Sequence, residues 1–270
     1  MKRIWVLTFM LIGSLVAIGQ AQLTPVQKSS QQPECQQVYD RFAAKWLDPE
    51  KWQLASPVCD SALECVREIR NGKLHMAVRN FGRTDSDSGS QAAFPILYFQ
   101  NPNAVTSITA DITVRSYSGS ACVTNDGTAN GQTQIGGTFF NAGTGDPSDD
   151  VFAILYTYVD TFNPTIMKVN VWWGWKDQGD NQKFAEYPIG TPVTATFKWD
   201  KSNHRFIGIV KVKGQPGTPA EVLVPYWMSD AAPAAYPDKR LVAVTFSPNC
   251  TSGQSSAQVE ATFDNVIINH

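Results

Sequence analysis

The chain has 270 residues, with 22 basic and 24 acidic residues and a formal net charge of −2. No cluster of basic residues stands out, which argues against nucleic acid or an anionic membrane surface as the main partner. The length would allow two domains, but no Pro/Ser-rich linker and no internal repeat divides the sequence, so a single domain is expected.

The N-terminal residues predict export. Lys2 and Arg3 precede an apolar run of about 15 residues, and Ala21 is positioned as the last residue of a signal peptide over residues 1–21. A membrane anchor is the alternative, but the run is shorter than the ~20 residues that span a bilayer. We therefore expect a secreted protein, extracellular or periplasmic, with no membrane span in its mature form.

The mature chain then begins with a polar segment. Residues 22–34 are rich in Gln and Pro and predict a flexible leader. Loss of Lys2 and Arg3 leaves 20 basic against 24 acidic residues. Residues 35–270 are expected to form the single folded domain, as a monomer.

All five cysteines lie in the exported part, where disulfides are expected. Two bridges and one free thiol allow 15 arrangements, and sequence alone does not choose among them. We favour Cys59 with Cys65, which are close in sequence, and Cys122 with Cys250, although Cys35 could displace a member of the first pair. A zinc site is disfavoured because there is no CxxC and there are only three histidines.

In chain order, the first expected element is a short helix near residues 35–47. The segment 64–82 then reads as strand, turn and strand around Asn71-Gly72, which is a strong hairpin signal. Further strands follow at regular intervals, separated by Gly, Pro, Asn and Asp; they are expected over 95–102, 107–117, 133–143, 151–159, 165–175, 192–200, 204–212, 220–227, 240–248 and 257–269. About a dozen strands with turn punctuation predict an all-β sandwich or barrel.

Four segments together carry a family resemblance: "YDRFAAKWLDPEKWQL", "REIRNGKLHMAVRNFG", "VTATFKWDKSNHRFIGIV" and "ATFDNVIIN". They resemble the secreted concanavalin A-like lectin/glucanase superfamily. The resemblance implies a two-sheet antiparallel jelly-roll sandwich that binds ligands on its concave face. Most members recognise or cleave carbohydrate, so it also implies a polysaccharide or glycoconjugate as partner.

A glycosidase of this fold needs two facing carboxylates, and the family's Glu–x–Asp–x–Glu strand is missing here. Glu64 and Glu68 share one face of a strand, but four residues place them about 13 Å apart. That separation exceeds the ~5 Å or ~6.5–9.5 Å that the two glycosidase mechanisms require. The sequence thus gives no catalytic pair.

A polysaccharide lyase is the second enzymatic alternative. The strand "REIR", which contains Arg67, is similar to the Arg–x–Glu–Leu–Arg strand of alginate lyases. However, "QIG" has Gly136 where that family carries its catalytic histidine, and the C-terminal Tyr–x–Lys–x–Gly–x–Tyr motif is missing. His75 is the remaining candidate for a catalytic base. Because the lyase motifs are incomplete, we do not expect an enzyme.

A structural Ca²⁺ is possible, and no other cofactor is expected. Asp146, Asp149 and Asp150 cluster in one loop, and Asp85 and Asp87 precede a glycine in another; such oxygen ligands suit calcium. The resemblance adds Asp264, a common calcium position in related carbohydrate-binding jelly rolls. The alternative is that these are solvated turns.

The stretch "KVNVWWGWK" holds three tryptophans in four positions. With a period of two, Trp173 and Trp175 extend the apolar row and are predicted to lie in the core, whereas Trp172 shares the polar face. The predicted ligand-binding residues are therefore Trp172, its neighbours on the polar face and the polar residues of other strands, namely Asn170, Lys168, Tyr156, Tyr158, Arg67, Arg79 and His75. We expect a non-catalytic, lectin-like domain, with an enzyme or a protein-interaction domain as alternatives.

Overall fold

The hairpin around Asn71-Gly72 forms as predicted. Asn71 and Gly72 have φ of 54° and 69°, the left-handed values that a two-residue turn of this kind requires. The turn joins β3 (Leu63–Arg70) to β4 (Lys73–Asn80), and the two strands pair antiparallel from Arg70 opposite Lys73 onward. The local turn chemistry thus sets the register of these two strands.

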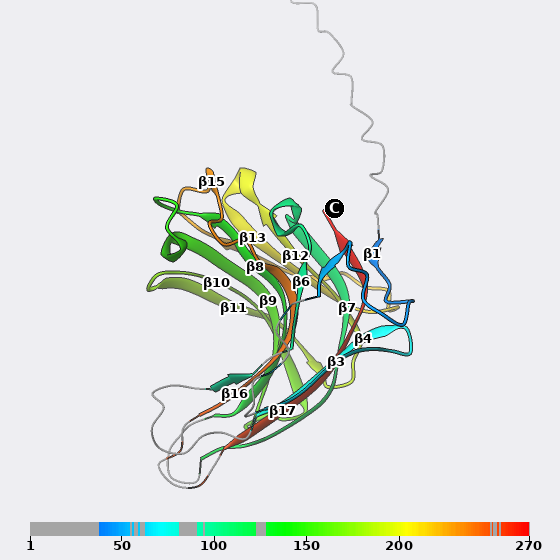
Figure 1. Ribbon diagram of the computed structural model, residues 1–270. Coiled ribbons are helices and arrows are strands. Elements are labelled where there is room, and N and C mark those ends of the chain that lie inside the picture. Colours follow the sequence, from blue (N-terminus) through cyan, green and yellow to red (C-terminus); the bar gives the residue numbers. More distant parts are fainter. Residues whose placement is uncertain are drawn as a thin grey trace, which may run out of the picture. The chain divides into compact units, whose positions relative to one another are not determined.

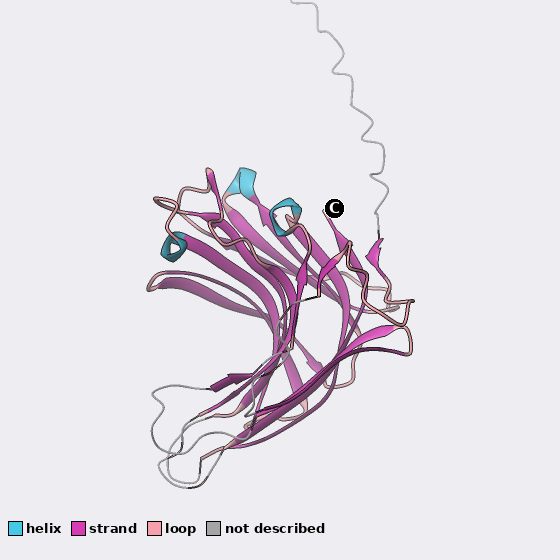
Figure 2. Cartoon of the chain, viewed as in Figure 1, coloured by secondary structure: helices cyan, strands magenta, loops and turns pink. Residues whose placement is uncertain are grey.

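The computed structural model describes residues 38–54, 56, 59, 63–80, 91–93, 95–122, 128–248, 250, 253 and 255–269. The signal peptide and leader predicted for residues 1–34 lie outside this part. Within the described residues, no helix is long and apolar enough to cross a bilayer. Three 3₁₀ turns, η1 (Pro102–Ala104), η2 (Pro147–Asp149) and η3 (Lys201–Asn203), accompany the strands (Figure 2).

The other strands are β1 (Val38–Asp40), β2 (Trp52–Gln53), β5 (Gln91–Ala93), β6 (Ile96–Phe99), β7 (Ser107–Ser120), β8 (Asn130–Asn141), β9 (Asp150–Asp160), β10 (Ile166–Trp175), β11 (Gln178–Pro188), β12 (Val193–Asp200), β13 (Arg205–Val212), β14 (Ala220–Pro225), β15 (Ala232–Pro233), β16 (Lys239–Ser247) and β17 (Ser256–Ile268). They form two antiparallel sheets. One has the order β14-β13-β12-β7-β17-β4-β3 with β1 on β17; the other has the order β11-β10-β9-β8-β16-β6-β2, with β15 on β8 and β5 on β16.

The sheets stack face to face with the core between them (Figure 1). This is an all-β, two-sheet antiparallel jelly-roll sandwich, and it confirms the fold that the superfamily resemblance implied. Its strands alternate inward and outward, because successive side chains of a strand point to opposite faces. On β10, Met167, Val169, Val171 and Trp173 are at most 1% exposed, as predicted for the core row, whereas Trp175 at its end is only partly buried and packs against the core.

The nine-stranded sheet is curved, and its outer surface lies on the inside of the curve (Figure 1). We call this surface the concave face; it is formed by the outward residues of β8, β9, β10, β11 and β16. The outer face of the eight-stranded sheet lies on the opposite side of the sandwich. A period of two decides whether a residue points inward or outward, and the sheet to which its strand belongs decides which of the two outer faces an outward residue joins.

At one edge of the sandwich, Arg67, a predicted ligand-binding residue, connects the two sheets by hydrogen bonds. The Arg67 guanidinium donates to the carbonyl of Ser56 at 3.0 Å and to the carbonyl of Ile96, so it links edge strand β3 to β6 of the other sheet. Burial lowers its pKa from the ordinary arginine value. Arg67 has a structural role between the sheets and does not face the concave surface.

The structure pairs Cys59 with Cys65 and Cys122 with Cys250, the two bridges favoured from the sequence. The second bridge spans 128 positions and ties the end of β7 to the segment that precedes β17. Cys35 lies outside the described residues. Two disulfides are compatible with an extracellular location, where the oxidised state persists.

Two local predictions are wrong. No helix forms over the described part of 35–47: Val38 and Asp40 pair with β17 instead, and Phe42 adopts a left-handed φ of 50° that ends any helical path. Phe42 is buried and stacks on Trp52, so core packing decides this segment. The prediction also omitted β11, an edge strand whose outward residues are polar and whose pairing with β10 contains a bulge.

Candidate functional site

The middle of the concave face is built around Trp172 of β10. Its strand neighbours in register are Ile154 on β9 and Asn181 on β11, and the next outward position on β10 is Gly174. A Cβ on Gly174 would lie 2.4 Å from the indole carbon Cζ2, so the indole lies directly against the glycine backbone. Only glycine leaves room for this contact, and the Trp172 side chain is partly buried there.

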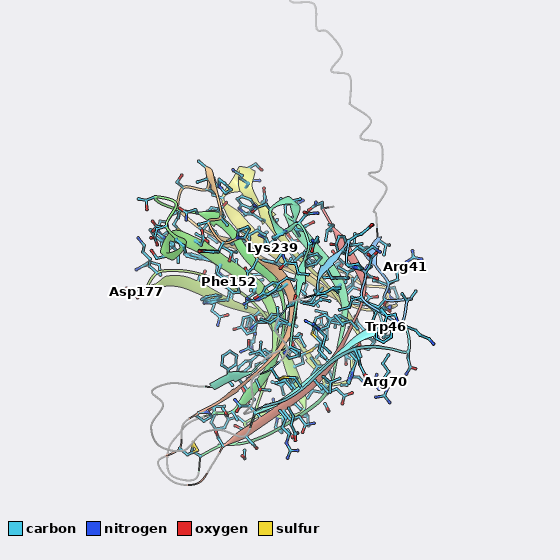
Figure 3. The ribbon with its side chains drawn as sticks, in the orientation of Figure 1. Arg41, Trp46, Arg70, Phe152, Asp177 and Lys239 are labelled. Carbon is cyan, nitrogen blue, oxygen red and sulfur yellow. A yellow bond between two sulfur atoms is a disulfide. The ribbon has the colours of Figure 1, made fainter. Side chains whose placement is uncertain are left out.

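Two further side chains continue this surface. The ring of Phe152 lies 5.8 Å from that of Trp172, tilted by 53°. The Arg240 guanidinium stands 4.6 Å from the Phe152 ring centre and is held by an ion pair of 2.8 Å with Asp238. Figure 3 shows Phe152 on the hollowed side of the curved sheet. The result is an aromatic pair with a cation stacked on one member.

Between Arg240 on β16 and Ile154 on β9, strand β8 contributes no side chain to the concave face. Gly136 occupies this position on β8, with φ of +136°, and a Cβ there would lie 2.4 Å from the carbonyl oxygen of Ala153. Glycine is thus required by both backbone conformation and space. The missing side chain leaves the floor beside the aromatic pair uncovered by residue 136. The position that alignment with alginate lyases would give to a histidine therefore has a backbone role.

The next outward row carries neutral hydrogen-bonding groups. The Tyr156 hydroxyl donates to Asn181 Oδ1 at 3.1 Å, and Gln134 lies beside Tyr156 in register. Gln134 Nε2 donates to Gln132 Oε1 at 2.9 Å, and Gln132 Nε2 donates to Asn130 Oδ1 at 3.2 Å, which forms a line of amides along β8. Burial raises the pKa of Tyr156, so its phenol stays neutral at physiological pH.

Lys168 lies further along the same face, where an aspartate balances its positive charge. Its ammonium pairs with Asp160 at 3.0 Å and stands 5.4 Å from the ring centre of Tyr158. Partial burial acts to raise the pKa of Asp160, but Lys168 and the backbone amides of Phe162 and Asn163 lower it overall. Lys168 and Tyr158 therefore form a self-contained group at the margin of the face.

The structure brings together five of the predicted ligand residues and separates three. Trp172, Asn170, Lys168, Tyr156 and Tyr158 share the concave face, with Asn170 only 7% exposed. Arg67, Arg79 and His75 do not lie with them. Arg67 lies between the sheets, because it shares the inward row of β3 with Cys65 and Ile69. His75 and Arg79 lie on the outer face of the eight-stranded sheet.

The aspartates proposed as calcium ligands have other partners. Asp149 pairs with Lys176 at 2.7 Å, while Asp146 accepts from the Ser148 amide as a helix cap. Asp150 accepts from the amides of Ala235 and Tyr236, both at 2.8 Å.

The remaining aspartates add no cluster. Asp264 accepts from the Asn265 amide at 2.8 Å. The described residues include no group of three or more His, Cys, Asp or Glu that could hold a metal ion. Asp85 and Asp87 lie outside those residues, and calcium stays a prediction.

Sequence reasoning missed Phe152, Arg240 and the glycines beneath them. Phe152 was detectable, because it continues the period-two row of Tyr156 and Tyr158 along β9. Arg240 was not, because its place beside Phe152 depends on β16 pairing with β8 across a long stretch of chain.

No protein-family model matches the chain, and no curated protein matches it. Several solved structures are similar. They include a GH131 beta-glucanase catalytic domain from Podospora anserina (12% identity, 84% of this chain and 88% of that one, TM-score 0.42) and porphyranase B from Zobellia galactanivorans (10%, 84% and 90%, 0.40). Lectin II from Ulex europaeus is similar at 10% identity, over 80% of this chain and 95% of that one, with a TM-score of 0.31. At such low TM-scores the likeness carries no conclusion about what this chain binds.

Proposed function

We propose that this protein is a secreted, non-catalytic carbohydrate-binding domain whose concave face holds a polysaccharide or glycoconjugate over Trp172. The observation that carries the proposal is the partly buried indole of Trp172, packed against Gly174 and beside Phe152. The CH-rich face of a sugar ring packs on such an aromatic surface, and its hydroxyls exchange hydrogen bonds with neighbouring amide, phenol and guanidinium groups. Asn181, Tyr156, Gln134 and Arg240 supply those groups here.

The side chains around Trp172 favour binding over glycoside hydrolysis. Three described carboxylates on the concave face or at its margin are engaged: Asp160 with Lys168, Glu186 with Lys183 at 2.8 Å and Asp238 with Arg240. Glycosidases need two carboxyl groups placed on either side of the scissile bond. The neutral row beside Trp172 suits recognition of a sugar.

The positions of two residues also disfavour the lyase alternative. A lyase needs an arginine that neutralises the uronate and a base beside the same sugar. Arg67 lies between the sheets, and His75 lies on the other outer face, so these two residues do not meet one substrate.

The proposal is tested by affinity electrophoresis and glycan-array binding of the mature chain. We expect Trp172→Ala to weaken retention by about tenfold or more, as the loss of a central aromatic anchor does. The matched control is Trp46→Ala, because Trp46 is 83% exposed and lies on the N-terminal segment, away from β10. Arg240→Gln should cause a smaller loss.

Equal retention of wild type and Trp172→Ala would sink the carbohydrate proposal. If the wild type bound no glycan but captured a defined protein partner through the same face, a protein-interaction domain would replace it. Release of reducing ends or of unsaturated uronates would identify an enzyme instead.

A further inference from the structure

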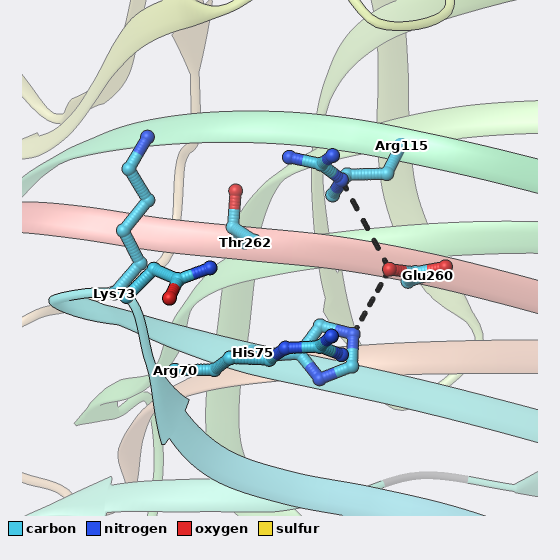
Figure 4. Close-up of a pocket in the computed structure, with 7 residues that line it drawn as sticks. Arg70, Lys73, His75, Arg115, Glu260 and Thr262 are labelled. Atoms are coloured by element: carbon cyan, nitrogen blue, oxygen red, sulfur yellow. Dashed lines mark hydrogen bonds and ion pairs between the residues drawn. The ribbon is translucent and has the colours of Figure 1, made fainter. Parts of the chain in front are cut away.

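A hollow of about 410 Å³ opens on the outer face of the eight-stranded sheet, on the side of the sandwich opposite Trp172. It lies beside the β3–β4 turn and crosses β4, β17 and β7 (Figure 4). The residues that line it are Arg70, Asn71, Lys73, His75, Arg115, Glu260 and Thr262. Six of these seven residues stand on strands, and Asn71 lies in the turn, so the hollow has a rigid frame.

Three of the seven lining residues are Arg or Lys, although the whole chain is slightly acidic. Arg70 and Lys73 form no ion pair within the described part of the chain. The guanidinium of Arg115 stands 4.0 Å from Glu260 and is more than half exposed. Figure 4 shows the Lys73 and Arg115 side chains on either side of the Thr262 hydroxyl. Three cations, Arg70, Lys73 and Arg115, therefore line the hollow together with the Glu260 carboxylate, and the first two form no ion pair with a described residue.

The floor of the hollow is fixed by His75, which is 8% exposed. Its Nε2 lies 3.0 Å from Glu260 Oε1, and its Nδ1 lies 3.3 Å from Glu68 Oε1. Glu260 Oε2 also accepts from the Ser116 hydroxyl at 3.4 Å. These contacts hold Glu260 in place at one side of the hollow.

We propose that this hollow is a second binding site, specific for a sugar acid, with Arg70 and Lys73 binding the anionic group and Glu260 accepting from a neighbouring hydroxyl. Arg70 and Lys73, which form no ion pair with a described residue, are the reason for proposing an anionic ligand. Guanidinium and ammonium groups form strong charge-assisted hydrogen bonds with carboxylates. The carboxylate in the lining favours a ligand with one negative group beside hydroxyl donors over a multiply charged phosphate. The volume is that of a small-ligand pocket.

The site does not rest on the function proposed for the concave face, because the two faces share no lining residue. Calorimetric titration of the mature chain with a galacturonic acid trisaccharide tests it, with the neutral galactose trisaccharide as the comparison ligand. We expect the acidic ligand to bind and the double variant Arg70→Gln/Lys73→Gln to weaken binding about tenfold or more, with smaller losses in each single variant.

The matched controls are Arg79→Gln and Lys198→Gln, which each remove one positive charge from the same outer face outside the hollow. They should change affinity less than about twofold, because exposed charges at a distance are largely screened. Trp172→Ala should leave this binding unchanged, which separates failure of this site from failure of the concave-face proposal.

Three results would overturn the inference. The first is absence of binding by the acidic trisaccharide, and the second is equal binding by the wild type and the double variant. The third is inorganic sulfate that competes with the same affinity as the acidic trisaccharide, which would leave an anion site without specificity for a sugar.

Discussion

The two outer faces of the sandwich have the same strand geometry and different chemistry. The concave face carries an aromatic pair and a row of amides around Trp172, whereas the opposite face carries Arg70, Lys73, Arg115 and Glu260 around a hollow. Inward rows on both sheets are mostly apolar and largely buried. The difference indicates that the core constrains every second residue of a strand, while the alternate residues are free to differ in chemistry between the two faces.

The largest expected effect separates the inward from the outward row of β10. Trp173→Ala should lower the free energy of unfolding by about 3–5 kcal/mol, because it empties a fully buried site and removes the edge contact with Trp227 at 5.0 Å. Trp172→Ala should cost less than about 1.5 kcal/mol, since its ring is half-exposed. Urea unfolding measures both; equal losses would contradict the division of the strand into core and binding residues.

Lys239 is a buried cation in a largely apolar interior. It is 1% exposed, and burial lowers its pKa to about 7, against the opposing Asp238 and Asp150 carboxylates. An unfolded lysine has a pKa of about 10.4, so between these values the unfolded chain binds a proton that the native state lacks. This group therefore makes the free energy of unfolding rise with pH, by at most about 1.4 kcal/mol per pH unit between pH 7 and 10.

Lys239→Met removes that dependence. We expect denaturant unfolding at several pH values to show a shallower rise for the variant than for the wild type, and greater stability of the variant at pH 7. Parallel curves for the two proteins would show that Lys239 stays charged in the native state.

A smaller effect is expected from Asp111, which ties together three strands on the charged side. It accepts from Thr194 Oγ1 at 2.6 Å and Asn265 Nδ2 at 2.7 Å, and it pairs with Lys213 at 2.6 Å. Partial burial acts to raise its pKa, but these partners hold it below the ordinary aspartate value. Asp111→Asn should cost about 1–2 kcal/mol at neutral pH.

The pH dependence supplies the check on Asp111. Because its native pKa is depressed, its contribution is present above the unfolded value of about 4 and is lost as pH falls through the native value. The difference between wild type and variant should therefore shrink in acid. Asp177→Asn, on the exposed β10–β11 turn, is the control and should leave stability unchanged.

The smallest expected effect is that of salt on the concave face. Raising ionic strength from about 0.05 to 0.5 M should change the affinity for neutral glycans less than about twofold, since uncharged groups dominate there. Binding of the uronate trisaccharide to the hollow should fall severalfold, because screening weakens exposed charge pairs. Titrations at both salt concentrations compare the faces directly, and equal salt dependence would contradict their different chemistry.

The fold followed from local signals. The Asn71-Gly72 turn, the alternation on β10 and the spacing of strands each depend on neighbouring residues, and the structure has all three. The site followed in part: Trp172 and Tyr156 meet because β9 and β10 are consecutive strands that pair.

Long-range pairing is what sequence patterns could not supply. His75 and Trp172 are both outward residues, but β4 and β10 belong to different sheets, so they lie on opposite sides of the sandwich. The inward position of Arg67 could have been predicted, because it alternates along β3 with the outward residues Glu64 and Glu68. The strand at Val38–Asp40 could not, because it depends on pairing with residues 266–267 more than 200 positions away.

The bulge in the pairing of β10 with β11 has a consequence for behaviour at high concentration. β11 is an edge strand, and an open edge offers backbone groups to which another chain can add. The irregular register between Val169 and Asn170 distorts this edge, and Lys183 and Glu186 place charges along it. Bulges and charged residues are features by which natural sheets resist edge-to-edge polymerisation. The edge strand that borders the concave face is therefore protected against fibril growth.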